Sequence, residues 1–212
     1  MANDERTLLG LRPLNQPHGN IQVHYYRANT AVNMFRFQPV VLNNSGQVQV
    51  AAVADMSGIL GVAIGFLDGD KASLPSDMTS LSLGAYLRSG NNAYVAVADD
   101  PIQEFVCEAD TGGGTIGSLN SAGQTISFVY QSSSTTDGNV TTGIANVLLD
   151  SSTTAADTGG ILTLVRPWDR VNQDGTINGP AQGNYEKWVV YINSHQKGPL
   201  NLGPGGALGL PG

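Results

Sequence analysis

Gly58-Ile59-Leu60-Gly61-Val62-Ala63-Ile64-Gly65-Phe66 is the most apolar stretch of this sequence, and the turn-forming residues Asp68-Gly69-Asp70 follow it. A short apolar run bounded by turn residues is typical of a buried β-strand. We therefore interpret residues 58–66 as the most apolar strand of a β-fold. Because glycines interrupt the run, the segment from Ile59 to Leu67 is too short to span a bilayer, and we expect a soluble protein with no membrane partner.

Further strand candidates extend outward from this stretch in both directions, and turn sequences such as Asn43-Asn44-Ser45-Gly46 separate them. The candidates are residues 21–26, 35–37, 40–42, 48–53, 94–98, 105–109, 126–130, 144–149, 161–165 and 188–193. This spacing predicts an all-β fold with a β-barrel, β-tulip-like or sandwich body. The segment from Ser76 to Leu87 is the exception, because it is also compatible with a brief helix capped by Ser76 or Asp77.

The same patterns divide the chain into four parts. Residues 1–20 are predicted to form an extended N-terminal arm, 21–111 a first β-barrel-like unit, 112–197 a second β unit, and 198–212 a Gly/Pro/Leu-rich C-terminal tail. Leucines in an arm without a core of its own usually become buried on another chain or domain, although chain ends are often disordered instead. The leucines expected to contact other subunits or the capsid are Leu8, Leu9, Leu11, Leu200, Leu202, Leu208 and Leu210.

Composition and charge limit the possible partners. Charged residues make up 13% of the 212 residues, against about 25% in an average protein, and 27 residues are glycine. The net charge is -7, and no Lys or Arg lies between Ser89 and Val165. Phosphate binding needs clustered basic residues, so we expect no nucleic-acid partner. The polar N-terminal sequence and the single cysteine, Cys107, favour synthesis and folding in a reducing cytoplasm.

Three motifs in the sequence could indicate a functional site, but each lacks the neighbouring residues that such a site needs. Gly112, Gly114 and Gly117 have dinucleotide-loop spacing, but poor helix formers follow them. Residues 172–175 resemble the middle of a calcium loop, yet the register places Arg170 and Ala181 at ligand positions. The adjacent carboxylates Asp99 and Asp100 precede Pro101, and we interpret them as a solvated turn because consecutive strand residues face opposite sides. The sequence therefore predicts no catalytic, cofactor-binding or metal-binding residues.

Scattered segments between residues 26 and 196 resemble virion proteins of bacteriophages. The segments that resemble the opening barrel of capsid cement proteins are Tyr26-Arg27-Ala28-Asn29-Thr30-Ala31-Val32, Phe37-Gln38-Pro39-Val40-Val41, Gly58-Ile59-Leu60-Gly61-Val62-Ala63, Ala93-Tyr94-Val95-Ala96-Val97-Ala98-Asp99-Asp100-Pro101 and Gln103-Glu104-Phe105. Residues 162–167 and 187–196 are similar to the end of virion proteins from marine and freshwater phages.

The resemblance implies a non-enzymatic capsid decoration (cement) protein of a tailed bacteriophage. Such a protein is a homotrimer on the outer capsid surface, where it clamps subunits of the major capsid protein against internal DNA pressure. Its partners would be the major capsid protein and itself, with no cofactor. Two other function classes stay open: a trimeric tail-fibre or spike receptor-binding module, and a phage-borne polysaccharide hydrolase that uses Asp99 or Asp100.

Overall fold

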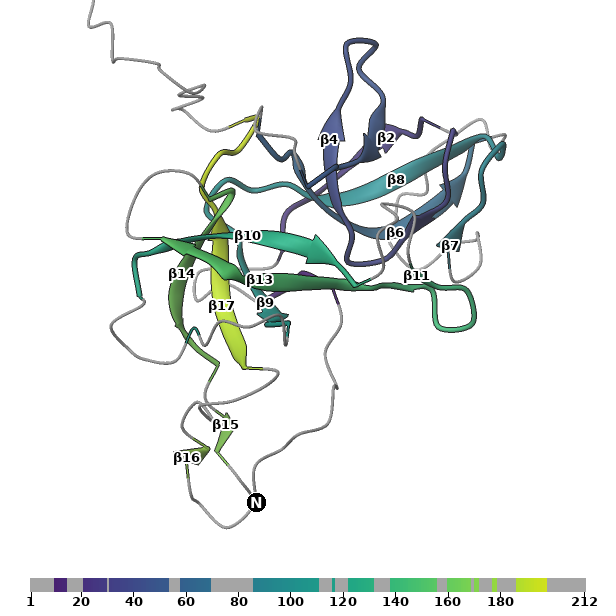
Figure 1. Cartoon of the computed structure of the whole chain (residues 1–212). Coiled ribbons are helices and arrows are strands. Elements are labelled where there is room, and N and C mark those ends of the chain that lie inside the picture. The colour runs from purple at the N-terminus through teal and green to yellow at the C-terminus, as the bar shows by residue number, and fades with distance from the viewer. Residues whose placement is uncertain are drawn as a thin grey trace, which may run out of the picture.

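A computed structural model describes the chain over residues 10–14, 21–29, 31–53, 58–69, 86–110, 116, 122–131, 138–155, 160–168, 170–171, 177–178 and 186–197. Over these residues the fold is all-β and contains no helix, as predicted. Two larger antiparallel sheets and three short strand pairs make up the structure (Figure 1).

The first large sheet has five strands in the order β2-β8-β6-β4-β5. Its strands are β2 (Val23–Arg27), β4 (Pro39–Leu42), β5 (Val48–Val50), β6 (Gly61–Asp68) and β8 (Ala93–Ala98). Residues 61–66 of the most apolar stretch lie in β6, which pairs with both β8 and β4. β6 and β8 are almost entirely buried where their side chains are described, which explains why both read as continuous apolar runs.

The second large sheet has six strands in the order β1-β9-β17-β14-β10-β13. Its strands are β1 (Arg12–Pro13), β9 (Glu104–Glu108), β10 (Thr125–Tyr130), β13 (Val147–Ala155), β14 (Leu162–Pro167) and β17 (Lys187–Ile192). Among the described strands, β17 comes last along the chain, yet it lies between β9 and β14, as Figure 1 shows. The sheet therefore joins segments that are distant in sequence.

Three two-stranded ladders complete the described structure. They are β3 (Met34–Phe35) with β7 (Tyr86–Leu87), β11 (Gly138–Asn139) with β12 (Ile144–Ala145), and β15 (Arg170–Val171) with β16 (Ile177–Asn178). Of the segment that is compatible with a brief helix, residues 76–85 lie outside the described residues. Its last two residues, Tyr86 and Leu87, are in a strand, and a brief helix before them stays a prediction.

Both large sheets curl without forming a closed barrel among the described strands. In the first sheet, Ala28 just beyond β2 forms an isolated bridge with Val48 in β5. In the second, Ala109 just beyond β9 forms an isolated bridge with Leu149 in β13. A single bridge is not a ladder, so of the alternative bodies predicted from the sequence the sandwich is the consistent one.

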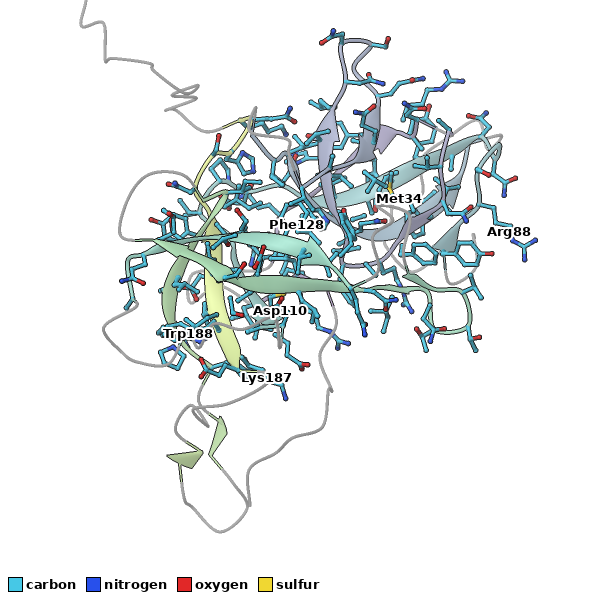
Figure 2. All side chains as sticks on the ribbon, viewed as in Figure 1. Met34, Arg88, Asp110, Phe128, Lys187 and Trp188 are labelled. Atoms are coloured by element: carbon cyan, nitrogen blue, oxygen red, sulfur yellow. The ribbon has the colours of Figure 1, made fainter. Side chains whose placement is uncertain are left out.

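A shared core joins the two large sheets. Its buried members include Val62 from the first sheet and Phe105, Phe128 and Trp188 from the second. A smaller core combines residues of the first sheet with Met34 from β3 and Leu87 from β7. Figure 2 labels Met34 and Phe128, one from each core. The chain passes from the first sheet to the second between β8 and β9, ahead of the glycine run at 112–114. The division of the chain at residue 112 into two β units stays a prediction.

Candidate functional site

The connection between β8 and β9 is a tight turn that links the two large sheets. In this turn the Gln103 N–H donates to the Asp100 carbonyl at 3.0 Å, and the Ile102 N–H donates to Asp100 Oδ1 at 3.0 Å. Pro101 occupies the second position, where its fixed φ suits a turn. The turn itself was expected from Asp99-Asp100-Pro101, and its tip is held by the Asp100 side chain.

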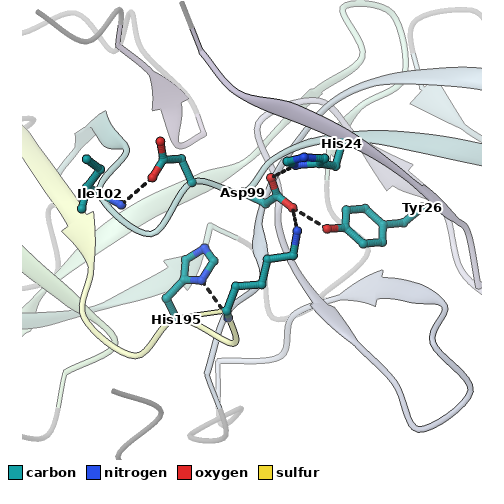
Figure 3. Close-up of polar contacts among 7 residues, drawn as sticks. His24, Tyr26, Asp99, Ile102 and His195 are labelled. Carbon is teal, nitrogen blue, oxygen red and sulfur yellow. Dashed lines mark hydrogen bonds and ion pairs between the residues drawn. The ribbon is translucent and has the colours of Figure 1, made fainter. Parts of the chain in front are cut away.

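Asp99, at the start of this turn, is buried, and the prediction that it is solvated is wrong. Its side chain is 0% exposed, and Figure 3 shows three side chains converging on it. His24 Nδ1 lies 2.6 Å from Asp99 Oδ1, while Lys197 Nζ donates to Oδ2 at 2.6 Å and the Tyr26 hydroxyl donates to the same oxygen. A carboxylate only accepts hydrogen bonds, so His24 donates from Nδ1.

Burial and hydrogen bonding shift the pKa values of Asp99 and Lys197 in opposite directions. The hydrogen bonds dominate, so the two groups form an ion pair at neutral pH. Burial acts to raise the pKa of Asp99, but the hydrogen bonds from Lys197, Tyr26 and His24 outweigh it and lower the pKa below its usual value. Burial acts to lower the pKa of Lys197, and its bonds to Asp99 and Tyr26 outweigh that effect and raise it. Burial and the bond to Asp99 raise the pKa of Tyr26. The cluster therefore holds an anionic Asp99, a cationic Lys197 and a neutral Tyr26.

The last described residues, 194–197, are attached to the first sheet. The Asp99 cluster holds Lys197, and backbone bonds join Ser194 and Gln196 to Ile59, just before β6. The Ile59 N–H donates to the Ser194 carbonyl at 2.8 Å, and the Gln196 N–H donates to the Ile59 carbonyl at 2.9 Å. Lys197 Nζ also lies 5.2 Å from the centre of the Tyr26 ring, a cation–π contact. We call residues 194–197 the C-terminal root, because the tail sequence continues directly from Lys197.

His195 is a buried part of this root. Its Nδ1 accepts the Lys197 backbone N–H at 3.0 Å, so the ring proton lies on Nε2. Burial lowers the pKa of His195, although the nearby Asp99 charge opposes this, and the ring is therefore neutral at pH 7. A neutral imidazole in this position orders the backbone of the root instead of adding charge to it.

An extended segment near the other end of the chain lies on the body in the same way. Gly10 N–H donates to the Val147 carbonyl at 3.0 Å, Leu11 N–H to the Phe37 carbonyl at 2.9 Å, and Leu14 N–H to the Glu104 carbonyl at 2.9 Å. Between them, β1 pairs with β9 and adds a strand to the second sheet. Residues 10–14 are thus bound by β-addition, and we call them the N-terminal root.

Local geometry explains why glycine occupies the start of this root. Gly10 has a φ of +80°, and a Cβ at this position would come within 2.5 Å of the Phe37 Cβ. Phe37 also has a positive φ, 66°, which is uncommon for a bulky residue. Its carbonyl accepts the Leu11 N–H while its own N–H donates to the Ala63 carbonyl at 2.6 Å. The close approach of two backbones requires this geometry.

Gln103 connects the N-terminal root to the turn between the sheets. Its side chain is buried, and its Nε2 donates to the Leu14 carbonyl and the Glu104 carbonyl, both at 2.6 Å. The turn is therefore held at both ends: Asp99 bonds to the C-terminal root and Gln103 to the N-terminal root. Nothing local in the sequence marks Gln103 for this role, because Leu14 is 89 positions away.

Of the seven leucines predicted to contact other subunits or the capsid, the described residues include Leu11. Leu11 is fully buried in the shared core of its own chain, so its side chain offers no surface to another subunit in this structure. Contact with another chain through Leu11 would require the core to open. The other six lie outside the described residues, and their role stays a prediction: Leu8, Leu9, Leu200, Leu202, Leu208 and Leu210.

The Asp99 cluster attaches the C-terminal root to the rest of the protein. The Asp99 carboxylate is buried and bonded to three donors. Among the residues that the structure describes, no group of three His, Cys, Asp or Glu side chains is placed to hold a metal ion. Over the same residues, no helix is long and apolar enough to cross a membrane.

Comparisons of the chain with protein-family models, with curated proteins and with solved structures gave no match.

Proposed function

We propose that this chain is a structural virion protein that binds the outer capsid surface of a tailed bacteriophage and stabilises the lattice of the major capsid protein. One observation carries the proposal beyond the sequence resemblance. The N-terminal root is an extended segment bound as an added strand, and its Leu11 side chain fills a core position. Addition of a strand to a sheet edge is also a mode by which an extended arm binds another chain, since main-chain bonds give affinity and inserted side chains give specificity.

The two roots explain how the ends would act on neighbouring subunits. The N-terminal root is held by backbone bonds to Val147, Phe37 and Glu104, and the C-terminal root by Asp99. Residues 1–9 and 198–212 thus start from fixed points on a packed body. Anchoring a segment at its base reduces the entropy lost when the rest of it binds. In a homotrimer, three copies of each weak contact act together through their effective concentration.

The test is to add purified protein to capsid shells that were assembled without it. The expected result is occupancy at symmetry-related sites on the outer surface, seen by electron cryomicroscopy, together with increased resistance of the shells to heat. Deletion of residues 1–9 and 198–212 together should abolish attachment while the body keeps its unfolding temperature.

Four outcomes would contradict the proposal. Wild-type protein that does not attach to shells removes the structural role, and full attachment by the doubly truncated protein removes the role of the ends. Specific binding on a glycan array without attachment to shells would favour a tail-fibre or spike module. Turnover of a polysaccharide by the purified protein would favour the hydrolase.

A further inference from the structure

Two nitrogen groups from different parts of the chain share the Asp99 carboxylate. His24 Nδ1 lies 2.6 Å from Oδ1, and Lys197 Nζ donates to Oδ2 at 2.6 Å. His24 lies in β2, within the first sheet, whereas Lys197 belongs to the C-terminal root. Asp99 is therefore the common partner of a group that the sheet holds in place and of a group that the root carries.

These two nitrogen groups are charged over different ranges of pH. A lysine is cationic throughout the neutral range, while histidine is the side chain that ordinarily gains its charge between about pH 8 and 5. Lys197 alone balances the charge of Asp99 when His24 is neutral. When His24 takes up a proton, two cations lie beside one anion and repel each other. The bond from Lys197 then contributes less to holding the root.

The other ionisable groups around the carboxylate do not gain charge in the same range of pH. Tyr26 donates its hydroxyl to Asp99, and its raised pKa keeps it neutral. His195, on the opposite side of Asp99 in Figure 3, is buried, and burial lowers its pKa. Asp100 adds a negative charge near His195. The His24 side chain is 57% exposed, so it can take up a proton directly from solvent.

The C-terminal root is attached mainly by polar contacts. Backbone bonds join Ser194 and Gln196 to Ile59. The Leu42 N–H donates to Gln196 Oε1 at 2.8 Å, and Gln196 Nε2 donates to the Leu42 carbonyl at 3.4 Å. Of the four root residues, only His195 is buried. A short segment with few buried apolar contacts opens at a lower free energy than a packed sheet, so the root can open while the sheets stay folded.

We propose that His24 is a pH sensor that controls the release of the C-terminal root from Asp99. In the closed state Lys197 opposes the binding of a proton to His24, and in the open state it does not. The open state therefore binds this proton more tightly, and linkage requires that it becomes more populated as the pH falls. The inference concerns the free protein and does not depend on the proposed capsid role.

Hydrogen exchange followed by NMR measures this opening at single amides. The reporters are the Gln196 and Ile59 N–H groups, whose bonds join the root to the first sheet. Their protection factors, corrected for the intrinsic pH dependence of exchange, should fall about fivefold between about pH 7.5 and about pH 5.5. The reference is the Ala145 N–H, whose bond to the Arg36 carbonyl involves neither the root nor the Asp99 cluster. Its protection should change by less than about twofold, because the sheets stay folded.

Two variants separate the sensor from the group that it releases. His24→Gln keeps a donor at an exposed position and carries no charge, so the reporters should have the same protection at both pH values. Lys197→Met removes the competing cation, so the root should open more often than in wild type and equally at both pH values. The matched control is Arg88→Met, which removes a cation over the Tyr86 ring, as Lys197→Met does over Tyr26, and should behave as wild type.

Two results would overturn the proposal. If the protection of both reporters in wild type is the same at the two pH values, release of the root is not linked to a proton. If the fall in protection persists in His24→Gln, the sensor is another group, and His195 is the histidine to replace next. Neither result bears on attachment to capsid shells, which tests the proposed function separately.

Discussion

Replacing Asp99 by Asn should destabilise the protein substantially, because the change removes the charge from a buried acceptor without changing its size. Hydrogen bonds to a charged group each contribute about 1.5–3 kcal/mol, and Asp99 accepts three. Two of the donors are partly solvated, since the side chains of His24 and Lys197 are 57% and 39% exposed, so water and salt reduce their share. We expect a net loss of about 2–3 kcal/mol. For a chain of this size, this corresponds to a fall of about 4–12 °C in the unfolding temperature.

Two measurements test this prediction. Urea unfolding gives the loss in free energy, and trypsin reports the C-terminal root, because it cleaves after Lys197 once that side chain is free to enter the protease. We expect cleavage at Lys197 to become several-fold faster in Asp99→Asn. The matched control is Asp100→Asn, whose side chain accepts one backbone N–H and should change stability by about 1 kcal/mol or less. Unfolding of Asp99→Asn within about 0.5 kcal/mol of wild type, with unchanged cleavage at Lys197, would refute the reasoning.

Three further predictions concern the core and the ionisable groups. Leu11→Ala should cost about 2–5 kcal/mol in urea unfolding because the side chain is fully buried, and a loss under about 1 kcal/mol would contradict its place in the core. Burial raises the pKa of the Cys107 thiol to about 12, so a thiol reagent at pH 8 should leave the native protein unmodified and react after unfolding. Since the folded-state pKa of Asp99 lies below the ordinary 3.8, its contribution is present above that pH and lost below it. The difference in stability between wild type and Asp99→Asn should thus shrink as the pH falls below 3.8, and it should be lost once the pH has fallen through the lowered pKa.

The strands were predictable because their signals are local. The apolar run at 58–66 gave the position of β6 to within a few residues, and the alternating or apolar candidates at 94–98, 126–130 and 188–193 coincide with β8, β10 and β17. Turn residues bound each of these segments in the sequence itself. Fold class followed from their spacing, which needs no knowledge of which strand pairs with which.

The Asp99 cluster was not predictable, because its members come from distant parts of the chain. Asp99-Asp100-Pro101 correctly indicates a turn, but no local feature shows that Tyr26 and Lys197, at separations of 73 and 98 residues, meet at the first carboxylate. The place of Leu11 in the core was not predictable for the same reason. Its surroundings in sequence suggest an arm, whereas the pairing of β1 with β9 places it in the core. Composition and periodicity carry no information on such long-range pairings.

The location of β17 has a consequence for how the protein is made. This strand occupies residues 187–192 and lies between β9 and β14. The six-stranded sheet therefore cannot be completed until β17 has been synthesised. Until then β9 and β14 each present an open edge, which is the kind of surface that recruits wrong strands. The five-stranded sheet is complete in sequence by residue 98 and can form much earlier during synthesis. Folding is therefore expected to proceed in two steps, with the later step waiting for the synthesis of β17 and exposed to aggregation or chaperone capture in the interval.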